Sequence, residues 1–194
     1  MKYRKLGKTN LMVSEIGLGG IPIQMCDERQ ATEVIDSLIE NGINFIDSAR
    51  GYTVSEKLIG SAIKGRRDKF IIATKSMARD YEGMKNDINQ SLINFQTDYI
   101  DLYQMHNLQN MDCAGAIKAL KEAKEEGKIL HVGVTSHNYD FLYDLIDHDS
   151  FFETIQFPYN FIENKAEALF NKYLMATSDL AILPPANGFI TIIA

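Results

Sequence analysis

The feature that most constrains this 194-residue chain is a repeated unit, in which a short apolar stretch is followed by an amphipathic helix. The apolar stretches recur roughly every 23 to 32 residues, the length of one β-strand and its crossover helix. Most are continuously apolar rather than alternating, which predicts strands buried on both faces and therefore a parallel sheet. No glycine-rich phosphate-binding fingerprint accompanies the repeat, and this favours a barrel over a doubly wound sheet.

The predicted fold is α/β, a (β/α)8 TIM-barrel type with an N-terminal β-hairpin, in a single domain over residues 1–194. The hairpin covers residues 1–13, where a Gly-Lys-Thr-Asn turn allows Asn10 a left-handed conformation. Asp27 is predicted to cap the first helix, and Asn41-Gly42 to end it. The predicted strands are 15–20, 43–47, 70–75, 99–106, 129–136 and 154–160, with helices between them, including one at about 55–64 and one through residues 166–174.

The C-terminal segment, residues 176–194, does not fit the repeat. The apolar run at 189–193 begins only a few residues after the run at 180–185, whereas a parallel crossover needs a dozen or more residues. The run at 189–193 is therefore not expected to be a regular eighth strand. A complete barrel has about 250 residues. The barrel is expected to be incomplete at this end, either because the chain is part of a longer protein or because the closing strand arrives in an unusual way.

Composition argues against several classes of protein. The formal net charge is -6 and no block of Lys or Arg occurs, which argues against nucleic acid or an anionic membrane surface as the main partner. Neither a signal peptide nor an apolar run of about 18 residues is visible. Cys26 and Cys113 have no metal-type spacing, so no metal site is expected. These observations predict reduced thiols in a cytoplasmic protein.

Three successive predicted strands end in residues suited to proton transfer. Asp47 ends the strand at 43–47, Lys75 ends the next and His106 ends the third, while Tyr52 follows on the loop after Asp47. Carboxyl ends of parallel strands meet on one face of a barrel, where such folds place their chemistry. A lysine beside Tyr52 is expected to lower the phenol pKa from ~10 toward the neutral range.

In this arrangement Tyr52 could act as general acid to a carbonyl oxygen, and His106 could hydrogen bond to the same oxygen. Each residue alone has an ordinary explanation, as a helix cap, a solvated charge or half-buried packing. Their occurrence together at successive strand ends favours the functional interpretation.

Several motifs resemble, in order and spacing, those of the aldo-keto reductases: FIDSARGY with SEKLIG, ATK, DLYQMH, HVGVTSH and IQFPYN. The resemblance runs from about residue 3 to about residue 175. It implies a (β/α)8 barrel that transfers hydride between NADPH, or less often NADH, and a small carbonyl compound, without a metal. It also assigns the family's catalytic tetrad to Asp47, Tyr52, Lys75 and His106.

The same resemblance implies a set of cofactor contacts. Gly20 is expected near the cofactor and Asp47 near the nicotinamide ribose. The nicotinamide carboxamide is expected to meet Gln156 and the VGVTSH segment at the end of the strand at 129–136, where Thr135, Ser136 and His137 are the candidates. Ser136 stands where the family often has an asparagine.

The chain also departs from the family pattern. Residues 180–188 carry two prolines and no aromatic residue where the family has a pyrophosphate strap and often an aromatic that stacks on the nicotinamide. The segment that grips the adenosine 2′-phosphate in the family has no counterpart here. The SEKLIG and VGVTSH motifs are similar to those of a branch whose longer members carry a C-terminal iron–sulfur domain. Two other interpretations therefore remain beside the reductase: a catalytically silent cofactor-binding or regulatory barrel, and a fragment of a longer reductase.

Overall fold

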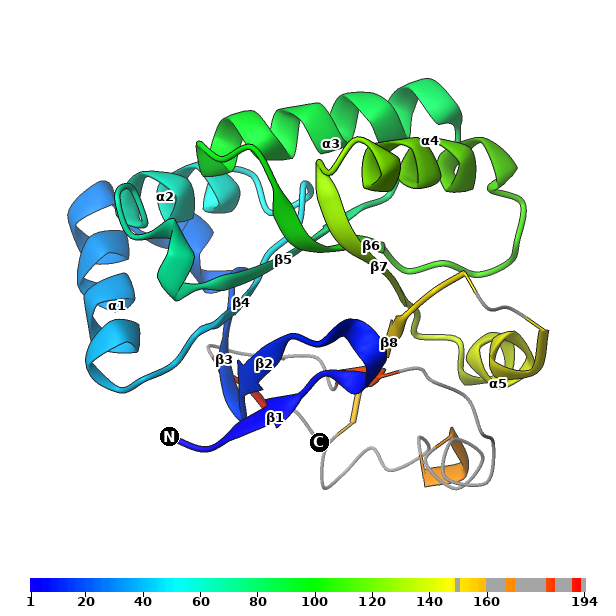
Figure 1. The fold of residues 1–194 in the computed structure, drawn as a ribbon, viewed down its shortest axis with the longest axis horizontal. Helices are drawn as coiled ribbons and strands as arrows, with labels where there is room; N and C mark the ends of the chain where they lie inside the picture. The colour runs from blue at the N-terminus through cyan, green and yellow to red at the C-terminus, as the bar shows by residue number, and fades with distance from the viewer. Residues whose placement is uncertain (149–150, 160–166, 170–180, 184–189, 193–194) are drawn as a thin grey trace.

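The computed structural model describes residues 1–148, 151–159, 167–169, 181–183 and 190–192. Most of the helix predicted through residues 166–174 lies outside the described residues. So do the two prolines after residue 183 and most of the segment 176–194. The described part consists of an N-terminal hairpin, a curved parallel sheet and helices on its outer side (Figure 1).

The N-terminal hairpin has the predicted form. Strand β1 (Tyr3–Lys5) pairs antiparallel with β2 (Met12–Ser14), and a short 3₁₀ turn η1 (Gly7–Thr9) joins them. Asn10 has a φ of 62°, the left-handed conformation that an asparagine tolerates. The hairpin prediction is therefore confirmed, including the residue that makes the turn.

Eight strands form the main sheet in the order β10-β3-β4-β5-β6-β7-β8-β9. Neighbours from β3 to β9 run parallel, whereas β10 runs antiparallel to β3. The predicted barrel-type α/β class is confirmed, and β10 is not a regular parallel strand, as expected. The bounds are β3 (Ile16–Gly19), β4 (Phe45–Asp47), β5 (Ile71–Ser76), β6 (Ile100–Met105), β7 (Ile129–Thr135), β8 (Thr154–Gln156), β9 (Ala181–Leu183) and β10 (Ile190–Ile192).

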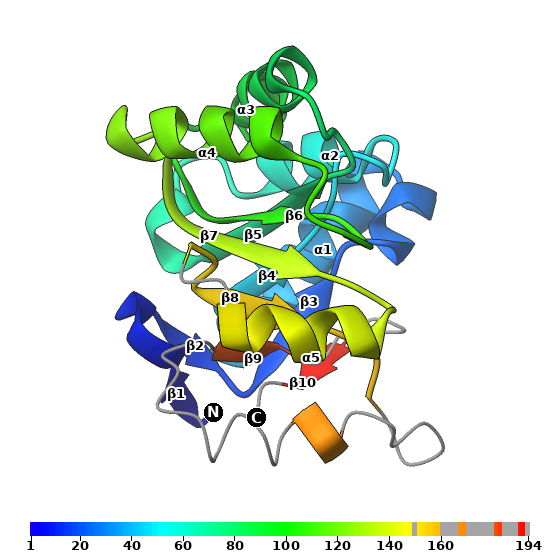
Figure 2. The same ribbon diagram turned by 90° about the vertical axis from the view of Figure 1, so that its right-hand side faces the viewer.

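The helices follow one another around the outside of the curved sheet (Figures 1 and 2). Residues 167–169 are also helical, and two further 3₁₀ turns, η2 (Pro22–Met25) and η3 (Arg67–Lys69), precede α1 and β5. Each α-helix lies between two strands of the repeat, as the sequence predicts. Their bounds are α1 (Glu28–Glu40), α2 (Ser55–Ala62), α3 (Tyr81–Phe95), α4 (Ala114–Glu125) and α5 (Tyr139–His148).

Helix α1 shows how local sequence sets these bounds. The Asp27 side chain accepts the Gln30 N–H at 2.7 Å, and the Gln30 side chain accepts the Asp27 N–H at 2.9 Å, which forms a capping box. At the other end Gly42 has a φ of 68°, and the Ile43 N–H donates to the Leu38 carbonyl. Because Ile43 takes part in this helix ending, β4 begins later than the predicted residue 43.

Side chains alternate along each strand and so divide between two apolar clusters. The outward residues pack under the helices; Ile46, Ile72 and Val134 are examples with no exposed surface. The inward residues near the N-terminal ends pack against the hairpin, in a cluster that contains Phe45, Ala73, Leu102, Leu6 and Val13. The hairpin therefore closes one end of the barrel interior with apolar side chains, and the other end is left for polar residues.

Candidate active site

Polar side chains occupy the interior face at the carboxyl ends of five neighbouring strands. Asp47 lies two residues beyond Phe45 on β4 and shares its inward face. On the next pair of strands Lys75 is in register with Gln104. On β7 and β8, Thr135 is in register with Gln156. The pleat and the register thus bring residues distant in sequence to one end of the barrel.

Asp47 and Lys75 form a buried ion pair at the centre of this group. Lys75 Nζ lies 2.8 Å from Asp47 Oδ1 and also donates to the Ser48 carbonyl oxygen at 2.7 Å. Asp47 Oδ2 accepts Gln156 Nε2 at 3.0 Å, and Gln104 Nε2 donates to Oδ1 at 3.4 Å. A buried carboxylate is tolerated when it is paired and hydrogen bonded in this way.

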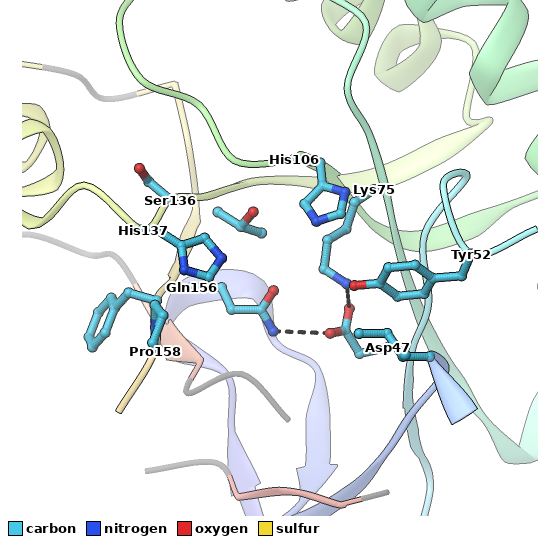
Figure 3. Close-up of a pocket in the computed structure, with 11 residues that line it drawn as sticks. Asp47, Tyr52, Lys75, His106, Ser136, His137, Gln156 and Pro158 are labelled. Carbon is cyan, nitrogen blue, oxygen red and sulfur yellow. Dashed lines mark hydrogen bonds and ion pairs between the residues drawn. The ribbon is translucent and has the colours of Figure 1, made fainter. Parts of the chain in front are cut away.

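Tyr52 reaches the ion pair from the loop between β4 and α2. That loop is held by the Ser55 hydroxyl, which donates to the Gly20 carbonyl oxygen at 2.8 Å and lies 2.9 Å from the Ser48 hydroxyl. The hydroxyl end of Tyr52 points to Lys75 (Figure 3). Lys75 Nζ is 5.3 Å from the centre of the Tyr52 ring. The phenol therefore has a cation as its immediate neighbour.

The net effect on the Tyr52 pKa is opposite to the expectation from sequence. Burial is the largest cause and raises the pKa of Tyr52 above 10.0, while Lys75 lowers it and Asp47 raises it again. The expected influence of Lys75 is present, but desolvation of the phenolate outweighs it because the Lys75 charge is shared with Asp47. The prediction of a lowered pKa is therefore wrong for the chain by itself. Tyr52 is a protonated phenol at neutral pH.

His106 faces Tyr52 from the loop after β6. The two rings meet edge to face, with centroids 5.9 Å apart and planes at 87°. Burial, followed by the charge of Lys75, lowers the pKa of His106 from 6.5 to about 4. His106 is therefore neutral at pH 7. Its Nδ1 atom is buried and has no hydrogen-bond partner among the described residues.

Thr135, the last residue of β7, and Ser136, which follows it, carry two hydroxyls beside the same site. Ser136 donates its backbone N–H to the Gln156 carbonyl oxygen at 3.0 Å, which fixes β7 against β8. The Ser136 hydroxyl accepts the Asn138 N–H at 3.0 Å, and the Thr135 hydroxyl accepts the Asn107 N–H at 2.8 Å. Both hydroxyls are thus oriented as acceptors by the backbone and keep their own hydrogens for another partner.

One cavity of about 100 Å³ collects these side chains (Figure 3). All the candidate residues from the sequence except Gly20 line it. His137 is more exposed than its neighbours and faces the cavity beside Gln156. The lining residues are Ile21, Asp47, Tyr52, Lys75, His106, Thr135, Ser136, His137, Gln156, Phe157 and Pro158.

Gly20 is not among the residues that line this cavity. Its N–H donates to the Asp47 carbonyl oxygen at 2.8 Å, across β3 and β4. A Cβ atom at Gly20 would meet the hydroxyl oxygens of Ser48 and Ser55 at 2.8 and 2.9 Å. The missing side chain is therefore explained by close packing under the Tyr52 loop. A cofactor contact for Gly20 stays a prediction.

Sequence reasoning missed four residues of the site. Gln104 is buried and touches Asp47, yet its own Oε1 has no partner among the described residues. Its place could have been found from period-two alternation, since it lies two residues after the inward Leu102 on β6. Ile21, Phe157 and Pro158 supply the apolar wall. They follow strand ends, which is the signal that identified the polar residues.

Among the residues that the structure describes, no group of three or more His, Cys, Asp or Glu side chains is arranged to hold a metal ion. None of the described helices is long and apolar enough to cross a lipid bilayer.

Comparison with known proteins gives a consistent result. Residues 15–185 match the sequence profile of the Aldo/keto reductase family. The chain is 37% identical over 153 residues to the uncharacterized oxidoreductase YqkF of Bacillus subtilis, covering 70% of this chain and 49% of that protein. The chain spans about half the length of the curated relatives it matches.

Solved structures agree with the sequence relatives. Aldo-keto reductase AKR11C1 from Bacillus halodurans, in its holo form, superposes with a TM-score of 0.83 at 31% identity, over 94% of this chain and 65% of that one. An aldo-keto reductase from Klebsiella pneumoniae in complex with NADPH gives a TM-score of 0.82 at 23% identity, over 93% and 66%. The second likeness concerns the fold alone. Taken with the match over residues 15–185, these findings show that the chain belongs to the aldo/keto reductase family.

Proposed function

We propose that this chain is an NAD(P)H-dependent oxidoreductase that reduces an aldehyde or ketone to an alcohol, with Tyr52 as the general acid. One observation carries the proposal: Tyr52 and neutral His106 face a single cavity beside the buried Asp47–Lys75 ion pair. Membership of the family supports the reaction class. The proposed site is a proton donor next to a place where a carbonyl oxygen can lie.

The residues beside the cavity fit the carboxamide of a nicotinamide. Thr135 and Ser136 have hydroxyl hydrogens to donate, and Gln156 adds an amide group. NADPH is the proposed cofactor, with NADH as the second candidate, in line with the NADPH that the Klebsiella pneumoniae reductase of similar fold binds. When bound, the cofactor supplies the hydride. Asp47, His137 and Gly20 are proposed as further cofactor contacts on the family resemblance.

The chain's own residues then donate the proton and stabilise the phenolate that is left. As hydride reaches the carbonyl carbon, negative charge develops on the carbonyl oxygen, and Tyr52 transfers its hydroxyl proton to that oxygen. A phenol is a much stronger acid than an alkanol, so this transfer is favourable even with the raised pKa of Tyr52. Lys75 stabilises the phenolate that remains, and Asp47 holds Lys75 in place. His106 orients the carbonyl oxygen through a ring N–H.

The decisive experiment is a calorimetric titration of the purified 194-residue chain with NADPH and, separately, with NADH. Binding of either is the expected result, and a screen of aldehydes and ketones for cofactor oxidation then follows. Binding with turnover supports the proposal. The absence of binding to both cofactors, or binding without oxidation by any carbonyl compound, would overturn it for this chain.

A matched pair of variants sharpens the titration. Ser136→Ala removes a hydroxyl proposed to hold the carboxamide, and we expect roughly two- to tenfold weaker NADPH binding from the loss of one hydrogen bond. Ser61→Ala removes an exposed hydroxyl on α2 and should leave affinity unchanged. Equal affinity in both variants would remove Ser136 from the cofactor site.

A further inference from the structure

A single turn after β6 connects two parts of the cavity lining, His106 and the residues 135–137. His106 follows β6, whereas Thr135 ends the neighbouring strand β7 and Ser136 and His137 follow it. The two groups face the cavity from different sides (Figure 3). Asn107 comes directly after His106 and contacts the β7 group. Its φ of 52° is left-handed, a conformation that residues with a side chain rarely adopt and that asparagine tolerates better than most.

Asn107 binds the segment 135–137 through its backbone and through its side chain. Its N–H donates to the Thr135 hydroxyl oxygen at 2.8 Å. Its Oδ1 accepts the His137 backbone N–H at 3.4 Å and Gln109 Nε2 at 2.7 Å. Two contacts on the same segment fix both the distance and the rotation of the turn. The backbone directly after His106 is therefore connected to the segment 135–137.

Arg79 holds the carbonyl side of the same turn. It comes from the loop between β5 and α3, and its Nη2 donates to the carbonyl oxygens of His106 at 2.7 Å and Asn107 at 3.3 Å. Within the described residues no acidic side chain pairs with it, so the carbonyl oxygens are its partners. Burial lowers the pKa of Arg79, but a guanidinium remains charged at any pH where the protein is folded.

We propose that Arg79 and Asn107 are positioning residues of the site, which together hold His106 in a fixed relation to the segment 135–137. The catalytic side of this inference rests on the proposed function. The geometric side does not, because the hydrogen bonds belong to the chain itself. Arg79 acts on the backbone of His106, and Asn107 transmits the position of that backbone to Thr135 and His137.

Arg79 also contributes to the charge around His106. Burial is the largest cause of the low pKa of His106, and the positive charge of Arg79 is a smaller one in the same direction. Replacing Arg79 by an uncharged residue should therefore raise this pKa, by less than the effect of burial. The titratable groups that face His106 are Tyr52, Lys75, Asp47, His137 and Arg79.

The test uses three variants that separate the charge of Arg79, its hydrogen bonds to the turn, and the side chain of Asn107. Arg79→Met removes both the charge and the hydrogen bonds, whereas Arg79→Lys keeps the charge and loses the planar fork. Asn107→Gly keeps the left-handed backbone and removes the side-chain acceptor. The readouts are the His106 ring pKa by NMR titration, the NADPH Kd by calorimetry, and kcat and KM for carbonyl reduction.

We expect Arg79→Met to raise the His106 pKa and to lower kcat about tenfold or more with little change in KM, because small displacements of a catalytic group have large effects. Arg79→Lys should keep the wild-type His106 pKa and recover part of kcat. Asn107→Gly should lower kcat and weaken NADPH binding together. Arg29→Met, at an exposed arginine on α1 that pairs with Glu33, is the control and should change nothing.

Unchanged kcat, NADPH affinity and His106 pKa in both Arg79→Met and Asn107→Gly would overturn the proposal. If Arg79→Met does not fold, Arg79→Lys and Asn107→Gly decide the question by the same readouts. The His106 titration needs neither cofactor nor turnover. A chain that binds no NADPH would therefore refute the proposed function, while the His106 resonances of the same variants would still test the positioning role.

Discussion

The two ends of the same strands carry opposite kinds of side chain on the face that points into the barrel. At the N-terminal ends Phe45, Ala73 and Leu102 pack against the hairpin. Two residues further along each strand, the same face carries Asp47, Lys75 and Gln104. One end therefore gains stability from apolar burial, and the other holds charges that a core would exclude.

The pleat explains how such different environments lie so close together. Inward positions repeat every two residues, so a strand of three residues such as β4 has room for one apolar and one catalytic candidate on the same face. The apolar residue, Phe45, packs against the hairpin, and the catalytic candidate, Asp47, pairs with Lys75. The comparison predicts that changes at the two ends will affect different properties of the protein.

The largest expected effect is on turnover and comes from the polar end. Tyr52→Phe removes only the hydroxyl, so we expect kcat to fall by about 10²–10⁴-fold with the free energy of unfolding and NADPH affinity nearly unchanged. Tyr99→Phe is the matched control, since its ring stacks on Arg67 at 4.3 Å and does not depend on the hydroxyl. A Tyr52→Phe enzyme with full rate would remove Tyr52 from the role of acid.

A change in the ion pair should make the polar end matter for stability. Lys75→Met leaves Asp47 as a buried charge without its cation, and we expect a loss of about 3–5 kcal/mol in the free energy of unfolding. The double variant Asp47→Asn with Lys75→Met should recover much of that loss while remaining inactive. Chemical denaturation measures both. A Lys75→Met protein as stable as the wild type would show that the pair is solvated.

The apolar end should respond in the converse way. Leu102→Ala opens a cavity against the hairpin, and we expect a loss of about 2–5 kcal/mol in the free energy of unfolding. Where the variant is folded, the His106 pKa and the NADPH Kd should equal those of the wild type. Ile93→Ala, at an exposed position of α3, should change stability by less than about 0.5 kcal/mol. Altered NADPH affinity in folded Leu102→Ala would contradict the separation of the two ends.

One titratable group at each end should make the free energy of unfolding depend on pH, in two separate acidic ranges. At the N-terminal end of β8, burial alone would raise the pKa of Glu153, but hydrogen bonds from His131, Lys124 and the Val132 N–H lower it to about 2. Its contribution is present above the ordinary value of 4.5 and is lost as the pH falls toward 2. His106 has a lowered pKa of about 4 and an ordinary value of 6.5.

Between pH 6.5 and 4 the unfolded chain binds a proton at His106 that the folded chain does not. The free energy of unfolding therefore decreases as the pH is lowered through this range also. We expect each contribution to be on the order of 1–2 kcal/mol after screening by solvent. Thermal melts across this pH range measure them. His106→Gln should remove the transition at higher pH, and Glu153→Gln the one at lower pH; a single transition that neither variant alters would refute both assignments.

Much of this arrangement can be predicted from sequence because strand ends are local signals. Asp47, Lys75 and His106 each end a recognisable apolar run, and family resemblance gave the same residues. Gln104 lies two positions after the inward Leu102, so alternation along β6 indicates its direction, but its contact with Asp47 exists only in the folded chain. The predicted direction of the shift in the Tyr52 pKa was wrong because burial, its largest cause, is a property of the folded chain. The antiparallel pairing of β10 with β3 joins the ends of the chain, and no local pattern encodes it.

Gly133 has a consequence for how this barrel can change over time. A Cβ atom at this position would lie 2.1 Å from the Thr154 hydroxyl oxygen and 3.1 Å from Gln104 Cγ, so the three residues share one fixed volume. A larger residue at 133 requires a smaller one at 154 or a shift of Gln104, which contacts Asp47. Substitutions at these positions will therefore be accepted in combination rather than singly, and homologues should show them covarying.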